Sequence, residues 1–323
     1  MKYKISVAMA VFEGENFIDQ QLNSILCQSL IPDEIIICDD SRNNKTYKAI
    51  EKIIAQHSEI IKYFKNETQL GVSKNFEKAI SLTSGDIIFL SDQDDVWRQD
   101  KIAQLASLIN ASPNCGGAFC NSELVNENLA PLNVTHLDLR GFGTSEILSC
   151  PTGGMMEFFL KRVPAAGHNM AFKAEFKDLI LPFPDLKECH DTWIGLVIAA
   201  TKRWAFTSDT LTQFRQHTNN VSQAGRSSQL KAALESIKND TNSWNMALYD
   251  ELIKRLSQSS YPTEPNVLGL LKDRRDHSAA RAKMNCNIFK RIPLVFKEIK
   301  NKRYFKYGRG WKNVIQDVLL RGL

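Results

Sequence analysis

Residues 85–97, with the sequence GDIIFLSDQDDVW, combine a continuous apolar run with a cluster of acidic residues. The apolar run predicts a strand over residues 86–90, and it is typical of a strand that is covered on both faces of a parallel sheet. In α/β folds built on such sheets, ligands bind just beyond the carboxyl ends of the strands. The acidic cluster that follows this strand is therefore a candidate binding site.

The cluster consists of three carboxylates, Asp92, Asp94 and Asp95. Carboxylates this close together repel one another unless a cation joins them. Oxygen ligands of this kind suit Mg²⁺ or Mn²⁺, which are typically held by one or two carboxylates together with the phosphates of a substrate. The cluster predicts a metal ion held for a diphosphate, and the alternative interpretation is a solvated acidic loop.

The chain before this stretch alternates between predicted strands and predicted helices. Strands are expected over residues 4–11, 34–38 and 60–65, and helices over residues 17–26, 46–56 and 74–82. This β-α-β repetition is the pattern of a doubly wound sheet.

The second of these strands also ends in carboxylates, Asp39 and Asp40. In nucleotide-binding α/β folds an acidic residue at this place accepts hydrogen bonds from ribose hydroxyls or a base N–H. The alternative is a turn that caps the next helix. The chain contains neither GxGxxG nor GxxxxGK[ST], so a dinucleotide fingerprint and a P-loop are both excluded.

The region after the acidic cluster is less regular. We expect a helix over residues 97–110, a strand over 117–121 and a polar loop over 123–151. Residues 155–163 are expected to form a helix or strand near the site, and residues 167–172 a glycine turn that enters a strand. Short strands are expected over residues 204–207 and 210–216. Asp191 opens an apolar helix over residues 194–200, where it is either a helix cap or a general base. His217 follows the last strand, and a single histidine of this kind is either structural or a metal ligand.

The composition is that of an ordinary globular protein, with 43% hydrophobic and 24% charged residues. The seven cysteines are scattered and form no Cys-x-x-Cys pair, which argues against a disulfide framework or a zinc site and favours a reducing compartment. The apolar run at the N-terminus is too short for a signal peptide, and no run is long enough for a transmembrane helix. We therefore expect a cytosolic protein.

Positive charge is concentrated at the end of the chain. The net charge is +5, yet the residues from Lys272 onward hold 15 Lys and Arg against 4 Asp and Glu. The rest of the chain is mildly acidic, so a nucleic-acid binder is not expected. Residues 290–320 mix Lys and Arg with Phe, Tyr and Trp, which suits a helix lying on an anionic membrane surface; the alternative is a solvated helical face packed on the main domain.

Several motifs, in this order, resemble the family-2 glycosyltransferases of the GT-A fold, most closely the bacterial rhamnosyltransferase-like branch that builds surface polysaccharides. The resemblance covers residues 3 to about 222. Its motifs are VAMAVFEGENFIDQQLNSILCQS (7–29), EIIICDDS (34–41), LGVSKNFEKAI (70–80), GDIIFLSDQDDVW (85–97), GHNMAF (167–172), HDTW (190–193) and FRQHTNN (214–220).

The resemblance implies a role for each matching residue. The metal motif falls on Asp92 and Asp94, and it favours Asp94 as the residue that binds the metal directly. His217 completes the site for Mn²⁺ or Mg²⁺. Asp191 matches the catalytic base. The implied nucleotide- and donor-binding residues are Val11, Glu13, Asp39, Asp40, Lys74, Asn75, Asp92 and Gln93, and the implied loop beneath the donor sugar and acceptor is Gly167, His168 and Asn169.

Two departures from the family pattern stand out. Many relatives carry Glu-Asp at the base motif, where this chain has His190 and Asp191, and the metal motif here is Asp-Gln-Asp-Asp. The chain also lacks a clear QxxRW motif, which argues against a processive synthase.

The resemblance implies a GT-A domain over residues 1–222 and a basic helical region over 223–323 that contacts the membrane peripherally. The implied activity is inverting, metal-dependent transfer of a hexose or deoxyhexose, such as rhamnose, from a UDP- or dTDP-linked donor to a saccharide or lipid-linked oligosaccharide. The implied location is the cytoplasm, at the inner face of the plasma membrane. The alternatives are a sugar-nucleotide pyrophosphorylase and a non-catalytic glycan-binding or scaffolding protein on the same fold.

Overall fold

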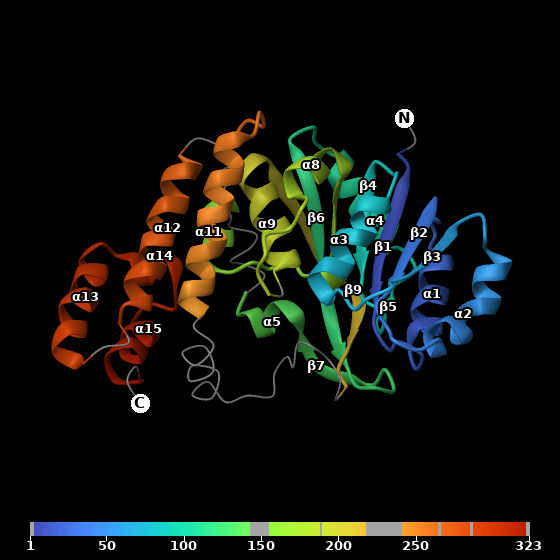
Figure 1. Ribbon diagram of the computed structural model, residues 1–323, viewed down its shortest axis with the longest axis horizontal. Helices are drawn as coiled ribbons and strands as arrows, with labels where there is room; N and C mark the ends of the chain where they lie inside the picture. Colours follow the sequence, from blue (N-terminus) through green and yellow to red (C-terminus); the bar gives the residue numbers. More distant parts are fainter. Residues whose placement is uncertain are drawn as a thin grey trace. The chain divides into compact units, whose positions relative to one another are not determined.

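The apolar run after Gly85 forms strand β4 (Ile87–Ser91), which lies inside a mixed sheet and is buried along its whole length. β4 pairs in parallel with β1 (Ile5–Val11), with Phe89 opposite Val7. Next come β2 (Glu34–Asp39) and then β3 (Ile61–Lys65), both parallel to β1. The carboxyl ends of these four strands therefore meet at one edge of the sheet, as the sequence predicts (Figure 1).

The structure, a computed structural model, describes residues 3–142, 155–187, 189–217, 241–263, 266–284 and 287–320. These residues fall into two compact units, one within Met1–Cys150 and Pro164–Ala224 and the other within Pro151–Val163 and Gly225–Leu323. The sheet belongs to the first unit.

The other half of the sheet is antiparallel to β4 at the point where the two halves join. Across the described residues, nine strands follow the order β3-β2-β1-β4-β8-β6-β9-β5, with β7 paired to β6. β8 runs antiparallel to both β4 and β6, whereas β9 runs parallel to β6. The bounds are β5 (Val96–Trp97), β6 (Cys115–Val125), β7 (Pro131–Thr135), β8 (Met170–Lys173) and β9 (Arg203–Arg215).

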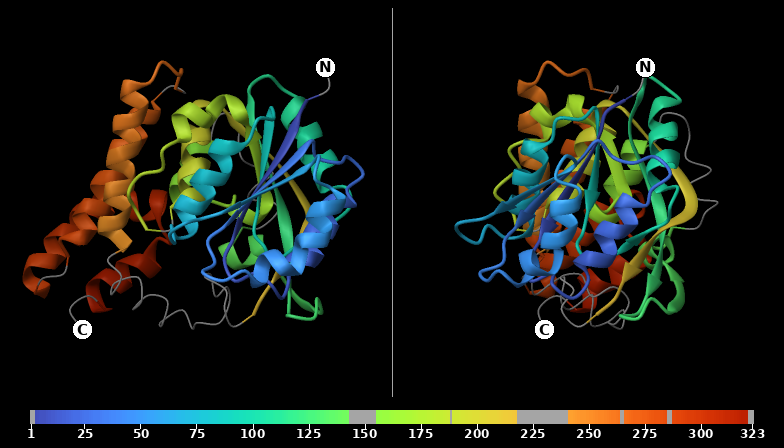
Figure 2. Two further views of the ribbon diagram at one scale, coloured as in Figure 1. Left: turned by 45° about the vertical axis from the view of Figure 1, so that its right-hand side comes forward. Right: turned by 90° about the vertical axis from the view of Figure 1, so that its right-hand side faces the viewer.

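Helices cover both faces of this sheet (Figure 2). Alternate residues of β1, β2 and β4, such as Met9, Ile37 and Phe89, pack with buried residues of the helices on one face, such as Leu22 and Leu105. These helices are α1 (Ile18–Leu26), α2 (Lys45–Gln56) and α4 (Lys101–Asn110). The opposite face carries α3 (Val72–Leu82), α8 (Lys177–Ile180) and α9 (His190–Thr201). Burial on both faces explains why β4 has no polar alternation.

Three predictions for the region after the acidic cluster are wrong. The helix expected from residue 97 begins at Lys101, because Trp97 pairs with Thr212 in the short strand β5. The loop expected over residues 123–151 contains the end of β6, strand β7 and helix α5 (His136–Arg140), since the polar residues of β7 lie on an edge strand exposed to water. The two short strands expected after residue 203 are one strand, β9, whose register shifts on β6 between Phe206 and Thr212.

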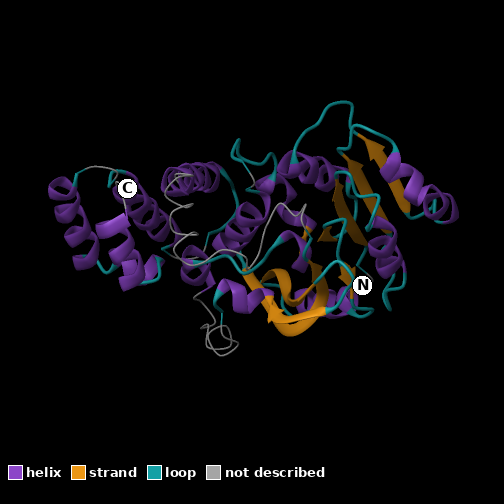
Figure 3. Cartoon of the chain, turned by 90° about the horizontal axis from the view of Figure 1, so that it is seen from below, coloured by secondary structure: helices purple, strands orange, loops and turns teal. Residues whose placement is uncertain are grey.

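The second unit is helical, as expected, and is drawn with the first in Figure 3. It contains α7 (Met155–Lys161), α11 (Thr241–Gln258), α12 (Val267–Ala282), α13 (Ile288–Lys300), α14 (Arg303–Tyr307), α15 (Trp311–Ile315) and a π-helical turn over Gln316–Leu320. Pro293 lies inside α13. The domain boundary expected at residue 222 lies outside the described residues.

Charged groups are buried inside the second unit. His277 Nδ1 lies 2.6 Å from Glu298 Oε2, and Arg281 Nε donates to Asp317 over the same distance. Tyr304 also donates its hydroxyl to Asp317, at 2.8 Å.

None of the helices in the described parts of the chain is long and apolar enough to cross a membrane.

Candidate active site

The acidic turn after β4 meets the end of β9. The pairing of β5 with β9 places Val96 opposite Gln213, and the chain from there brings His217 to the turn. His217 Nε2 lies 2.8 Å from Asp94 Oδ2, and both side chains are largely buried. Two of the three predicted metal ligands are therefore in direct contact.

Arg215 fixes this contact in place. Its backbone N–H donates to Asp95 Oδ1 at 3.0 Å, and its Nε donates to the Asp94 carbonyl at 2.7 Å. The guanidinium also donates to Gln20 Oε1 at 2.7 Å and to the Glu127 carbonyl. The buried side chain thus ties the acidic turn to α1 and to the turn between β6 and β7.

We expect Arg215→Met to lower the free energy of unfolding by about 3–5 kcal/mol, because three acceptors and two nearby carboxylates lose a buried positive partner. Urea denaturation followed by circular dichroism measures this change. Arg203→Met is the matched control, since Arg203 is exposed on the same strand. Equal stability of the two variants would contradict the anchoring role of Arg215.

A second group of ligand atoms comes from the same turn and from His168. Asp92, Asp95 and His168 each offer one such atom, and these atoms lie within 4.8 Å of one another. Asp95 Oδ2 and His168 Nε2 are buried and have no hydrogen-bond partner among the described residues. Unpartnered buried polar atoms are rare, and a bound cation would satisfy both. Carboxylate oxygens and imidazole nitrogens form a donor set that fits a divalent cation such as Mn²⁺.

The protonation of these groups follows from their surroundings. Burial raises the pKa of Asp92 to about 7, with further contributions from the charges of Asp94 and Asp191. Burial also raises the pKa of Asp95 well above its usual range. The pKa of His168 is held far below its ordinary value, mainly by burial, so its imidazole is neutral and able to bind a metal.

Lys101 supplies the positive charge beneath this cluster. Its buried Nζ donates to the His168 carbonyl at 2.7 Å and lies 3.8 Å from the centroid of the Trp97 ring. Burial lowers its pKa to about 8, against the attraction of Asp95 and Asp92. The acidic turn is therefore partly neutralised from within the protein.

Asp191 lies in the first turn of α9. Its Oδ1 accepts the Thr192 N–H at 2.6 Å, and its charge contributes to the raised pKa of Asp92. A Cβ built on Gly167 would lie 3.2 Å from His190 Nε2 and 3.8 Å from Asp92 Oδ2. The loop at Gly167 thus lies close to Asp92 of the predicted metal motif and to His190, the residue that precedes the predicted base.

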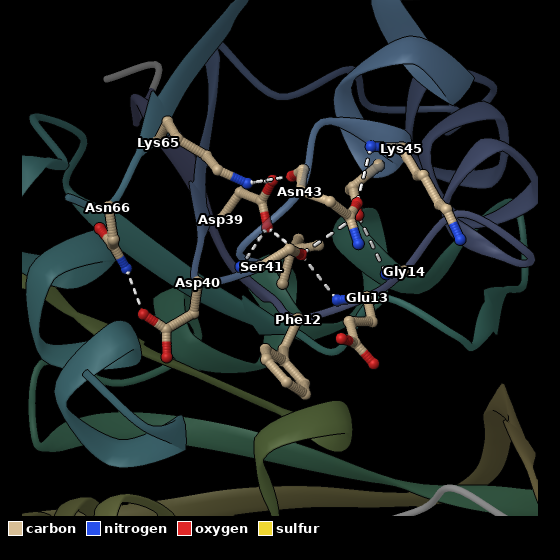
Figure 4. A network of polar contacts seen from close by, with 12 residues as sticks. Phe12, Glu13, Gly14, Asp39, Asp40, Ser41, Asn43, Lys45, Lys65 and Asn66 are labelled. Carbon is tan, nitrogen blue, oxygen red and sulfur yellow. Dashed lines mark hydrogen bonds and ion pairs between the residues drawn. The ribbon is translucent and has the colours of Figure 1, made fainter. Parts of the chain in front are cut away.

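The carboxylate of Asp39 is used inside the protein (Figure 4). Its Oδ1 accepts the N–H and the hydroxyl of Ser41, at 2.8 and 2.5 Å. Its Oδ2 accepts Lys65 Nζ at 3.0 Å and the hydroxyl of Tyr63. Asp39 therefore fixes the loop after β2.

Asp40 performs a similar task for the loop that enters α3. Its Oδ1 accepts Asn66 Nδ2 and the Leu70 N–H, and its Oδ2 accepts the Gly71 N–H, all at 2.8 Å. The contact with Asn66 is visible in Figure 4. Asn75 joins the same network, since its amide donates to the Cys38 carbonyl at 2.8 Å and accepts from Asn66.

Gln93 connects the acidic turn with the end of β1. Its side-chain amide accepts the Phe12 N–H and donates to the Phe12 carbonyl, both at 2.8 Å. The next residue, Glu13, is exposed and donates its N–H to Ser41 Oγ at 2.7 Å. The metal side and the predicted nucleotide side are thus linked through the backbone of two residues, Phe12 and Glu13.

The remaining predicted site residues have mixed surroundings. The side chain of Val11 is buried in the core, and its carbonyl accepts the Asp40 N–H. Lys74 is partly exposed and pairs with Glu77 at 2.9 Å. Asn169 is fully buried, and its amide contacts the Ala166 N–H and the Cys120 carbonyl. The roles of these residues in donor binding stay predictions.

The sequence-based predictions missed Lys101 and Arg215. Arg215 lies in a predicted strand, two residues before His217, so extending the period of two by one residue could have indicated that both side chains point to the same face. For Lys101 the only signal was its position near the start of the helix expected after the acidic cluster. Its contact with His168 depends on the fold and leaves no mark in the local sequence.

The comparisons with known proteins agree with this architecture. The model of glycosyl transferase family 2 matches residues 6–163. The dTDP-rhamnosyl transferase RfbG of Shigella flexneri is 24% identical over 268 residues, which cover 78% of this chain and 86% of that protein. The UDP-Glc:alpha-D-GlcNAc-diphosphoundecaprenol beta-1,3-glucosyltransferase WfgD of Escherichia coli is 28% identical over 141 residues, 42% of this chain and about half (54%) of that protein.

A solved structure is also similar in fold. The mannosyltransferase PcManGT from Pyrobaculum calidifontis, in complex with GDP-Man and Mn²⁺, superimposes with a TM-score of 0.53 and 15% identity, covering 98% of this chain and 84% of that chain. These findings confirm the predicted resemblance and the predicted fold. Residues 6–163, just under half of this chain, match the family-2 glycosyltransferases, and the chain has the GT-A fold.

Proposed function

We propose that the protein is an inverting, metal-dependent glycosyltransferase that moves a sugar from a nucleotide-diphosphate donor to a hydroxyl of a saccharide acceptor. The observation that carries this proposal is the meeting of two kinds of group at one sheet edge. Asp94 and His217 are in direct contact, and the nearby Asp92 lies within electrostatic range of Asp191. A cation site next to a carboxylate at a helix start is the arrangement that transfer from a diphosphate requires.

The proposed reaction exchanges one bond at the anomeric carbon for another. Asp191 accepts the proton of the acceptor hydroxyl as that oxygen forms a bond to the anomeric carbon. The bond between this carbon and the diphosphate oxygen breaks at the opposite side, and the nucleoside diphosphate leaves. A positioned base of this kind typically contributes about 10²–10⁴-fold in rate.

Asp92, Asp94 and His217 are the residues proposed to hold Mn²⁺ or Mg²⁺. When bound, the cation supplies Lewis-acid stabilisation of the negative charge on the diphosphate. Asp95 and His168 offer further ligand atoms beside Asp92. Lys101 below them keeps the cluster from accumulating uncompensated negative charge.

The donor-binding residues proposed on the nucleotide side are Val11, Glu13, Asp39, Asp40, Lys74, Asn75 and Gln93, and the proposed loop beneath the sugar is Gly167, His168 and Asn169. Internal contacts hold Asp39 and Asp40 in fixed orientations, which is the preorganisation that selective binding needs.

UDP- and dTDP-sugars are the proposed donors, and a rhamnose or related hexose is the proposed sugar, in line with the relatives named above. The acceptor proposed is a saccharide or a lipid-linked oligosaccharide of a bacterial surface polysaccharide. We propose that the enzyme works in the cytoplasm at the inner face of the plasma membrane, with residues 1–222 as the transferase domain and residues 223–323 as a helical region.

A donor screen on the purified protein tests this function. Release of free nucleoside diphosphate is followed for a panel of UDP-, dTDP- and GDP-sugars, with Mn²⁺ or with EDTA, because donor hydrolysis often proceeds slowly without an acceptor. We expect release from one donor with Mn²⁺ and none with EDTA. Release of pyrophosphate from a nucleoside triphosphate would instead indicate a pyrophosphorylase. If no donor released nucleoside diphosphate and nucleotide binding did not depend on metal, a non-catalytic glycan-binding protein would be favoured.

A further inference from the structure

Helix α13 of the second unit has two apolar faces, and only one of them is covered. Val295 on the inner face is buried, beside Arg291 and Glu298. On the opposite face, Phe289 is 82% exposed and Phe296 is 67% exposed. Apolar side chains of this size are rarely left this open without a partner.

The spacing of the exposed residues shows that they form one stripe. Ile292 and Pro293 lie three and four residues after Phe289, and Phe296 lies seven residues after it, so the four residues lie along a single side of the helix. Ile292 is 37% exposed, and Pro293 is exposed as well. We call these four residues the outer face of α13.

A second stripe follows at the end of the described chain. Trp311, Ile315 and Leu319 repeat every four residues through α15 and the π-helical turn, and their side chains are 61%, 55% and 63% exposed. The ring of Phe305 lies edge-on against Trp311, at a centroid distance of 5.5 Å. The second unit therefore presents two apolar stripes to its surroundings.

The charges around these stripes have one sign. In the described residues 287–320 the only acidic side chains are Glu298 and Asp317, and both are buried in ion pairs with His277, Arg303 and Arg281. The exposed charged residues of the same segment are all positive: Lys290, Lys297, Lys300, Lys302, Lys306, Arg309 and Lys312. Within residues 287–320, the buried pairs thus leave no exposed negative charge.

We infer that the outer face of α13 docks onto an anionic lipid bilayer, with its aromatic rings in the interface and its lysines against the headgroups. An apolar stripe flanked by lysines is the chemistry of helices that lie in the plane of a membrane surface. The positive charge selects an anionic surface, since lysines near such a surface are attracted by the negative potential of the lipids. A second copy of the chain would bring like charges together, and a partner protein would need a surface that is both acidic and apolar, whereas an anionic bilayer has both properties. This inference does not depend on the transferase activity.

Sedimentation of the full-length protein with vesicles tests the inference directly. We expect binding to vesicles of phosphatidylcholine mixed with phosphatidylglycerol, and little binding to phosphatidylcholine alone. Phe289→Ser combined with Phe296→Ser should weaken partitioning by more than roughly tenfold, since two large apolar groups no longer leave water. Both residues are exposed, so the melting temperature should stay unchanged and a folding defect cannot mimic the result.

Matched controls come from the first unit. Ile31→Ser combined with Leu132→Ser removes two exposed apolar residues, 55% and 45% exposed, that lie outside the outer face of α13, and should leave binding intact. Lys290→Glu with Lys297→Glu should weaken binding by more than roughly tenfold. Lys48→Glu with Lys52→Glu, which makes the same change of net charge on α2, should have little effect.

Three outcomes would overturn the inference. The first is no binding of the unchanged protein to anionic vesicles at low salt. The second is equal loss of binding in the control variants, which would indicate a non-specific charge effect. The third is a dimer, seen by light scattering, that Phe289→Ser dissociates without any change in vesicle binding; this would assign the outer face to a second copy of the chain.

Discussion

Asp191→Asn should lower the rate of sugar transfer by about 10²–10⁴-fold and leave the affinity for the donor nearly unchanged. The asparagine keeps the size of the side chain and its oxygen for the Thr192 N–H, so helix α9 should begin as before. What it loses is the ability to accept a proton from the acceptor hydroxyl. Steady-state turnover and donor titration calorimetry measure the two quantities separately.

Asp178→Asn is the matched control, because Asp178 is also an acidic residue in the first turn of a helix but is exposed. It should transfer sugar at the normal rate. Near-normal turnover of the Asp191→Asn variant would show that another group removes the proton. A large loss of donor affinity in that variant would instead indicate that Asp191 binds the donor.

Asp94→Ala should reduce turnover by about a hundredfold or more and abolish the dependence of nucleotide binding on Mn²⁺. The expected size follows from the several kcal/mol that a Lewis acid typically contributes to the stabilisation of a developing charge. The variant keeps the backbone carbonyl that Arg215 contacts, so the turn should stay in place. Titration of a nucleoside diphosphate with and without Mn²⁺ provides the measurement.

Asp100→Ala serves as the control, since its side chain is 42% exposed and pairs with Arg98 rather than with the site. If Asp94→Ala kept its response to Mn²⁺ while His168→Ala lost it, the cation would be held by Asp92, Asp95 and His168. The two variants therefore distinguish between the two groups of ligand atoms that the acidic turn offers.

The parallel half of the sheet was predictable because its signals are local. An apolar run of four to eight residues between turn residues predicts a buried strand, and β1, β2, β3 and β4 all begin and end within one residue of the prediction. The edge strand β7 was missed for the same reason, since its exposed and polar residues look like a loop. The pairing of Trp97 with Thr212 could not be predicted, because it joins residues that are far apart in the sequence.

The site shows the same division. Asp94, His217 and Asp191 were predicted from motifs, and the structure brings Asp94 into contact with His217 and Asp191 into electrostatic range of Asp92. The supporting side chains are Lys101, which contacts the His168 carbonyl, and Arg215, which contacts the acidic turn, and no local pattern records these contacts. The contacts of such supporting residues depend on the complete fold, whereas the residues that carry the chemistry of the site lie in short sequence motifs.

The register shift in β9 determines where this strand can change in length. From Thr212 to Arg215 each residue pairs with the next residue of β6, so one added or removed residue there would exchange the two faces of the strand. Arg215 and His217 would then point away from the acidic turn. Between Phe206 and Thr212 the extra residues of β9 already have no partner on β6, so this segment can absorb an insertion. We expect natural length variation among relatives to be confined to that irregular segment, with the four residues after it kept at constant spacing.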